Sequence, residues 1–306
     1  MADSPSVHAT SHILLIRPQQ SLIIDLTPQV YDAFMFPILE CLKYSSIAPA
    51  LTKVEVVPME FLSQIFATAH YDKAVDRIFF DVPDHKASIS KQRFCSILGF
   101  EPDSTRVNPE SIPVGHMFSM FYNMGYTEVL TTITKFKKSF LPPQWNGLFT
   151  VLFKGLSERS AGSDGASHLF IMILYGIYNG IHLDYGSVLW QQLIQSLSST
   201  SRHSEISYAR FWTLITKWVM DKYHVPIVAG SPMSSIGTFH TTKIIVFDAS
   251  KFQFIGSIPE SMYGDVPADS HIIRTYKEFR RSGPRELTPE MIKSIHEADK
   301  PAPRGK

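Results

Sequence analysis

The sequence predicts an α-rich α+β protein that is mostly helical and contains two small β-hairpins. Apolar residues recur at helical spacing along most of the 306-residue chain, whereas alternating, β-branched stretches are short and few. The helical stretches do not alternate regularly with strands, which argues against a doubly wound parallel sheet. The 21 Phe, 12 Tyr and 4 Trp residues supply enough apolar surface for a sizeable core.

A mobile N-terminal arm over residues 1–26 is expected to precede an α+β lobe over residues 27–139, because the chain begins with small polar residues. N-cap residues, first-turn prolines, apolar faces and terminating glycines mark the helices of this lobe. The predicted helices are Thr27–Tyr44, one opened by Pro58, Lys91–Leu98 and Val114–Met124. The predicted strands are Lys53–Val57, Arg77–Val82 and the returning Ala87–Ile89, with Ser45–Leu51 as a connector.

A helical lobe is expected over residues 140–226, because this part of the chain repeats apolar residues at helical spacing. Its predicted helices are Trp145–Leu156, Ala166–Tyr178, Ser187–Ser198 and Tyr208–Tyr223. Ala166–Tyr178 is apolar almost all round, so we expect it to be the most buried helix. Trp145 and Trp218 lie on apolar helix faces and are predicted to be core residues.

Residues 227–306 are expected to form a loop, a β-hairpin and a basic C-terminal tail. Proline and glycine residues indicate a long loop over Val225–Thr241. Two β-branched stretches, Thr242–Phe247 and Phe252–Ile255, predict the hairpin. A last short helix should begin at Leu287-Thr288-Pro289.

The charge of the chain is concentrated at its C-terminal end. The formal net charge is only +1, so bulk charge does not indicate a polyanion-binding protein. Residues 272–306, however, carry 9 basic and 5 acidic side chains, against 20 basic and 23 acidic in the rest. Neither a signal peptide nor an apolar stretch of membrane-spanning length is found, which predicts an intracellular protein, cytoplasmic or nuclear.

Sequence motifs of the common enzyme classes are absent from the chain. There is no phosphate-binding loop, no dinucleotide-binding glycine signature, no nucleophile elbow and no His-Glu-x-x-His pair. Cys41 and Cys95 are far apart and are expected to act as small apolar residues. His182 and Asp184 form the nearest His/carboxylate pair, which indicates a surface hydrogen bond. We therefore predict no catalytic residue, cofactor, metal ion or small-molecule substrate.

Asp248 is the residue that a nuclease hypothesis would use. Ile244–Ser250 followed by Phe252–Gly256 resembles the opening hairpin of ribonuclease H-like nucleases, whose first-strand aspartate binds Mg²⁺. Only 58 residues follow Asp248, and that fold needs about twice as many before its carboxylates can converge on two metal ions. A surface hairpin with Asp and Ser in its turn is the simpler interpretation.

A basic run near the C-terminus is the candidate nucleic-acid contact. Its spacing would place most of the cations on one helical face, with aromatic residues between them, so that they reach phosphates. The alternative is a solvated helix face whose charge is partly balanced by glutamates. The residues are Arg274, Lys277, Arg280, Arg281 and Arg285.

Two stretches of the chain carry a family resemblance. The first comprises Val57–Phe66, Asp76–Phe80, Ile89–Phe94 and Leu98-Gly99-Phe100. The second comprises Phe140–Trp145, Gly155–Ser157, Gly162–Asp164, Asn179 and Tyr208–Phe211. In order and spacing they resemble the Gag-like N-terminal region of long-terminal-repeat retrotransposon proteins of flowering plants. The matching residues are structural ones, and they span over half the chain.

The resemblance implies a non-catalytic protein that self-assembles, packages element RNA, or does both. It supplies no catalytic residue, and the chain lacks the Cys-x₂-Cys-x₄-His-x₄-Cys zinc knuckle of a complete Gag protein. RNA would then be held by the basic tail. Two alternatives stay open: a truncated ribonuclease H-like nuclease or transposase fragment, and a domesticated nuclear binding module of the mobile-element type.

Overall fold

The structure of the protein is a computed structural model. The structure describes residues 13–27, 39, 42–43, 45–82, 85–100, 105–158, 164–179, 181–198, 204–239 and 287–300. Within these ranges helical residues outnumber strand residues far more than twofold, and the sheets are small, which confirms the predicted α-rich α+β class. No helix in this part of the chain combines the length and apolarity needed to span a bilayer.

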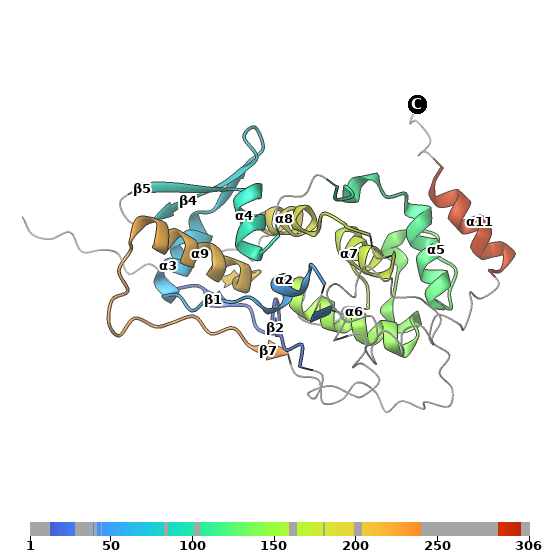
Figure 1. Ribbon diagram of the computed structural model, residues 1–306, viewed down its shortest axis with the longest axis horizontal. Coiled ribbons are helices and arrows are strands. Elements are labelled where there is room, and N and C mark those ends of the chain that lie inside the picture. The colour runs from blue at the N-terminus through green and yellow to red at the C-terminus, as the bar shows by residue number, and fades with distance from the viewer. Residues whose placement is uncertain are drawn as a thin grey trace, which may run out of the picture.

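A small antiparallel sheet occupies one end of the elongated molecule (Figure 1). The strands β3 (His70–Asp72), β4 (Arg77–Val82) and β5 (His85–Ser90) pair in that order. Alternate residues of β4 and β5 are buried, as period-two alternation requires of a half-buried sheet. The predicted first hairpin is thus confirmed, while the hairpin predicted over residues 242–255 lies outside the described residues.

Helices α3 (Met59–Thr68) and α4 (Lys91–Leu98) pack on this sheet, and α9 (Ala209–Tyr223) packs on both helices. α4 has the predicted bounds because local groups set both of its ends. The Ser90 hydroxyl accepts a hydrogen bond from the Arg93 amide, and Gly99 ends the helix at φ 91°, where a side chain would be strained.

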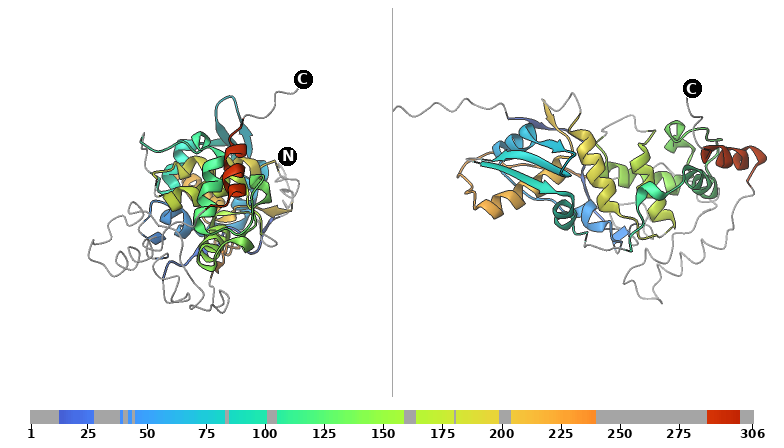
Figure 2. Two further views of the ribbon diagram at one scale, coloured as in Figure 1. Left: turned by 90° about the vertical axis from the view of Figure 1, so that its right-hand side faces the viewer. Right: turned by 90° about the horizontal axis from the view of Figure 1, so that it is seen from above.

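The other end of the molecule is a group of helices (Figures 1 and 2). It contains α5 (Val114–Met124), α6 (Pro143–Leu156), α7 (His168–Asn179) and α11 (Pro289–Ala298). α8 (Tyr185–Ser196) packs on α4 and on α7 and so joins the two ends, and the buried apolar residues of both ends belong to one core. Because α5 packs against α7 and α11, this grouping crosses the lobe boundary predicted at residues 139–140.

Residues 13–26 are built into the fold, which differs from the mobile arm predicted for residues 1–26. β1 (Leu15–Ile16) pairs in parallel with β6 (Glu205–Ile206), and β2 (Ile23–Ile24) pairs in parallel with β7 (Thr238–Phe239). The side chains of Leu14 and Ile24 are buried in the core. Pairing partners about 190 and 215 residues away leave no local signal in the sequence, so the prediction missed both pairs.

Two short segments differ from their predicted structure. The predicted connector Ser45–Leu51 contains the start of a helix, α2 (Ala48–Thr52), because Pro49 in its first turn is compatible with a helix. The predicted strand Lys53–Val57 forms no ladder. It ends at an isolated antiparallel bridge instead: the Val57 amide donates to the Ser234 hydroxyl, and the Val57 carbonyl accepts from the Ser234 amide.

The prediction that Ala166–Tyr178 forms the most buried helix is wrong. α8 buries nine of its twelve residues, whereas α7 buries seven of its twelve, although α7 is the more apolar helix. α8 lies between α4 and α7, so neighbours cover both of its sides. Position in the fold decides burial here more strongly than apolar content. Short 3₁₀ turns complete the described structure: η3 (Pro109–Ser111), η4 (Ile133–Lys135) and η5 (Lys138–Phe140).

Candidate nucleic-acid interface

The residues proposed to contact nucleic acid or a nuclease metal ion lie outside the described residues. This holds for the whole basic run from Arg274 to Arg285 and for Asp248, and Cys41 lies outside them as well. Their roles stay predictions. In the described ranges, no group of three or more His, Cys, Asp or Glu residues is placed to hold a metal ion.

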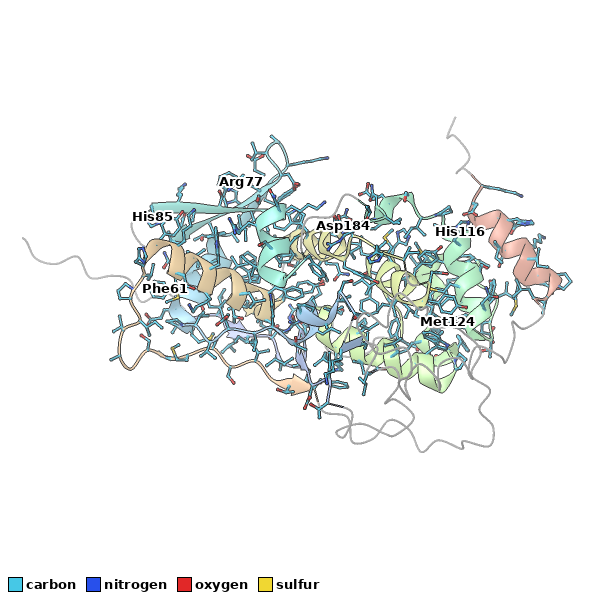
Figure 3. All side chains as sticks on the ribbon, in the orientation of Figure 1. Phe61, Arg77, His85, His116, Met124 and Asp184 are labelled. Carbon is cyan, nitrogen blue, oxygen red and sulfur yellow. The ribbon has the colours of Figure 1, made fainter. Side chains whose placement is uncertain are left out.

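In the His182/Asp184 pair, the Asp184 carboxylate caps a helix. Asp184 is the N-cap of α8, where it accepts hydrogen bonds from the Ser187 amide at 3.0 Å and from the Ser187 hydroxyl. Figure 3 labels Asp184 at this end of the helix. A carboxylate at an N-cap satisfies free amides and interacts favourably with the helix dipole. The structure therefore gives Asp184 a structural role.

Cys95 is not an activated thiol. Burial, and secondarily the nearby Asp184 carboxylate, raise the pKa of the Cys95 thiol to about 11. A thiol in that state forms very little of the thiolate that attacks substrates or binds metal ions at neutral pH. Cys95 packs against the core, as predicted for a small apolar residue.

Arg210 is the one charged side chain among the buried residues of the described core. Its Nε atom donates to the Ser21 carbonyl at 3.1 Å and its Nη1 atom to the Lys53 carbonyl at 2.9 Å. Its Nη2 atom donates to the Ala50 carbonyl at 2.5 Å and to the Gly155 carbonyl at 2.8 Å. Burial lowers the pKa of Arg210 to about 9, which leaves the guanidinium charged at neutral pH.

The carbonyl partners of Arg210 explain its position. Ala50 and Lys53 lie at the C-terminal end of α2, and Gly155 lies in the last turn of α6. Unpaired carbonyls at helix C-termini carry partial negative charge, so one cation stabilises two helix ends at once. Arg210 thus joins α2, α6, α9 and the N-terminal segment, and it is a structural centre without access to solvent.

The surface formed by α4, the start of β5 and the last turns of α9 has a different character. The first turns of α9, residues 209–216, are buried all round, whereas in the last turns only Val219 and Met220 are fully buried. Trp218 and Tyr223 therefore keep partly exposed rings beside the exposed residues Arg93, Lys222 and His85. We call these five residues the cation–aromatic surface.

Contacts within the cation–aromatic surface connect three separate elements. The Arg93 guanidinium lies 5.8 Å from the centre of the Trp218 ring, and the Lys222 ammonium lies 5.2 Å from it. Lys222 also lies 4.8 Å from the Tyr223 ring, whose other neighbour is the His85 imidazole at 4.2 Å. Figure 3 shows His85 at the end of β5 that lies beside α9. Each cation–ring pair contributes about 0.5–1 kcal/mol at an exposed site.

The charge of this surface is positive. The neighbouring Lys217 forms an ion pair with Asp221 at 2.5 Å, so these two charges balance. In the part of the chain that the structure describes, Arg93 and Lys222 form no ion pair with a carboxylate. Cations available to phosphates next to aromatic rings available to bases are the combination that binds single-stranded nucleic acid.

Trp218 corrects the sequence prediction, which placed both Trp145 and Trp218 in the core. Trp145 is completely buried, whereas Trp218 is only partly buried and carries two cations. The helical spacing places Trp218 beside Ile215 and Val219, and spacing alone does not show that only one side of α9 stays buried from this turn onward. The spacing of four residues between Trp218 and Lys222 could have indicated that these two side chains are neighbours on the helix. No sequence pattern indicates that Arg93 of α4 approaches the same ring.

Comparisons with protein-family models, with curated proteins and with solved structures find no match to this chain.

Proposed function

We propose that the chain is a non-catalytic, Gag-like structural protein that packages single-stranded RNA, and that the cation–aromatic surface helps to hold that RNA. The observation that carries this proposal is the position of two cations, Arg93 and Lys222, at one partly exposed indole ring, neither of them in an ion pair with a carboxylate of the described residues. The family resemblance of the sequence supports the structural role.

The chemistry of the surface suits RNA without selecting a sequence. A cation that neutralises a phosphate releases counterions whatever the base, and an aromatic ring stacks on any base. Lys222 has a flexible stem, so its ammonium group can move from the indole to a phosphate while a base takes its place on the ring. Packaging needs only such contacts, whereas specific DNA binding needs contacts with base edges in a groove.

The basic run Arg274, Lys277, Arg280, Arg281 and Arg285 supplies further phosphate contacts in this proposal. Both sets of cations would act on the same RNA, since phosphate contacts position the chain and add to its salt dependence. Replacing Arg280 and Arg281 by alanine should therefore reduce the salt dependence without changing which RNA sequences bind.

The test measures binding of a labelled oligouridylate by fluorescence anisotropy over a salt series. In single strands each phosphate contact contributes about 0.7 to the slope of log K against log salt, so Arg93→Gln with Lys222→Gln should flatten the slope by about 1.4. Trp218→Leu keeps an apolar contact with the core but removes the stacking face. It should weaken binding about 5- to 150-fold, which corresponds to about 1–3 kcal/mol.

A matched control removes the cation of a cation–ring pair elsewhere on the molecule. Lys137 lies 6.0 Å from the Phe140 ring, outside the cation–aromatic surface, so Lys137→Gln should leave the slope unchanged. An unchanged slope in the Arg93/Lys222 variant would refute the role of this surface. Absence of RNA binding at low salt by the unaltered chain would refute the packaging function.

The same preparation distinguishes the two alternative functions. A binding module for duplex DNA should bind a duplex more tightly than the single strand, and it should depend little on Trp218, because paired bases cannot stack on the indole. A nuclease should cleave the oligonucleotide when Mg²⁺ is added, and Asp248→Asn should abolish that cleavage.

A further inference from the structure

The C-terminal helix α11 lies at the end of the molecule opposite to the cation–aromatic surface (Figures 1 and 2). It packs on α5, about 180 residues earlier in the chain. The Asp299 carboxylate accepts a hydrogen bond from the Gly115 amide at 2.7 Å. The Ser294 hydroxyl lies 2.6 Å from the Tyr122 hydroxyl, which also accepts a hydrogen bond from the Leu130 amide.

The surface of α5 is built to receive this helix. The residue before α5 is Pro113, which provides no side-chain cap, so Asp299 acts as the N-cap from another helix. A Cβ atom on Gly115 would lie 2.7 Å from the Ile295 carbonyl oxygen and 2.7 Å from the Asp299 Cγ atom. The nearest atoms outside α5 itself thus belong to α11 and to Asp299, the residue that follows it, and the glycine is needed for this close approach. We call the α5 surface that receives α11, with Gly115 and Tyr122, the α5 groove.

α11 is separable from the rest of the fold. Ser294 is its only buried residue, and its apolar contacts, such as Met291 and Ile295, are partly exposed. The main packing partner of α11 among the described elements is α5. Between Phe239 and Leu287 lie 47 residues, which span up to about 155 Å when extended. The length of this connection is sufficient to reach a neighbouring molecule.

We propose that α11 is exchanged between two copies of this chain, each copy inserting its α11 into the α5 groove of the other. Both halves of the contact are present on every copy, so the exchange closes into a two-fold dimer with two identical contacts. Each exchanged contact repeats the bonds of the observed one: Asp299 to Gly115 and Ser294 to Tyr122. The inference deepens the proposed structural role by naming a contact for self-association, and it does not depend on RNA binding.

The test uses two full-length variants with complementary defects. Gly115→Ala blocks the groove but leaves α11 intact, and alanine favours the α5 helix itself. Asp299→Ala removes the cap but leaves the groove intact. We expect the unaltered chain to shift towards twice the monomer mass as its concentration rises in light scattering, and each variant alone to stay monomeric. An equimolar mixture of the variants should recover association, because one intact helix then meets one intact groove.

The controls separate groove exchange from other kinds of association. Ile292 lies on the exposed side of α11, so Ile292→Ser should associate as the unaltered chain does. Circular dichroism should show that both single variants keep their helical content. A chain that stays monomeric at all concentrations, or a mixture that associates no better than the separate variants, would overturn the proposal. RNA binding measured on the same samples should be retained, which separates failure of this proposal from failure of the packaging function.

Discussion

Replacing Arg210 by methionine should strongly destabilise the fold. Methionine fills a similar length but donates no hydrogen bond, so the carbonyls of Ser21, Ala50, Lys53 and Gly155 each lose a buried donor. A buried acceptor left without its partner costs about 1–3 kcal/mol, so four acceptors at the low end of that range give about 4 kcal/mol. Removing the desolvated charge offsets part of this, and the expected loss is about 2–4 kcal/mol.

The measurement is urea unfolding followed by tryptophan fluorescence, for which the completely buried Trp145 and Trp212 are reporters. The expected loss is a large fraction of the roughly 5–15 kcal/mol by which domains are stable. Lys217→Met is the matched control, because Lys217 is a partly exposed cation on the same helix whose charge is not buried in the core, and no measurable change is expected. A loss for Arg210→Met below about 1 kcal/mol would show that the four hydrogen bonds do not stabilise the helix ends.

Two further predictions concern local features. Asp184→Ala removes the N-cap of α8 and should lower the unfolding free energy by about 1 kcal/mol. Asp184→Asn should lower it by much less, because asparagine also caps helices, and equal losses in both variants would contradict the capping role. Burial lowers the pKa of His168 below its ordinary value of about 6.5. As the pH falls below about 6.5, the unfolded chain binds this proton before the folded chain does, so the free energy of unfolding should decrease. Urea unfolding at about pH 7.5 and about pH 5.5 should show a smaller decrease for His168→Gln than for the unaltered chain.

The two proposed contacts lie at opposite ends of the long axis of the molecule (Figure 1). The cation–aromatic surface lies at the sheet end, and the α5 groove lies at the end that carries α11. If both proposals hold, RNA binding and exchange of α11 do not compete for the same residues. A dimer formed through α11 would then carry two cation–aromatic surfaces, and its apparent affinity for a long RNA would exceed that of the monomer through multivalency.

The sequence by itself determined most helix bounds, because local groups set helix ends. Ser90 and Gly99 bound α4, Gly125 ends α5, and Thr288 caps α11 through the Met291 amide, all within a few residues of the helix they define. The alternating strand Arg77–Val82 was equally evident, since a half-buried sheet requires period two.

Only the tertiary structure decided which helical residues reach solvent and which distant residues meet. Trp218 lies at core spacing but is partly exposed, because from that turn onward only the Val219 and Met220 side of α9 is buried. Arg210 appears in the sequence as an ordinary cation, and its burial depends on carbonyls from three remote segments. Gly115 must be small only because α11 returns to it from about 180 residues away. Such contacts are made between segments whose separation leaves no periodic or capping signal, so they follow from packing and not from local pattern.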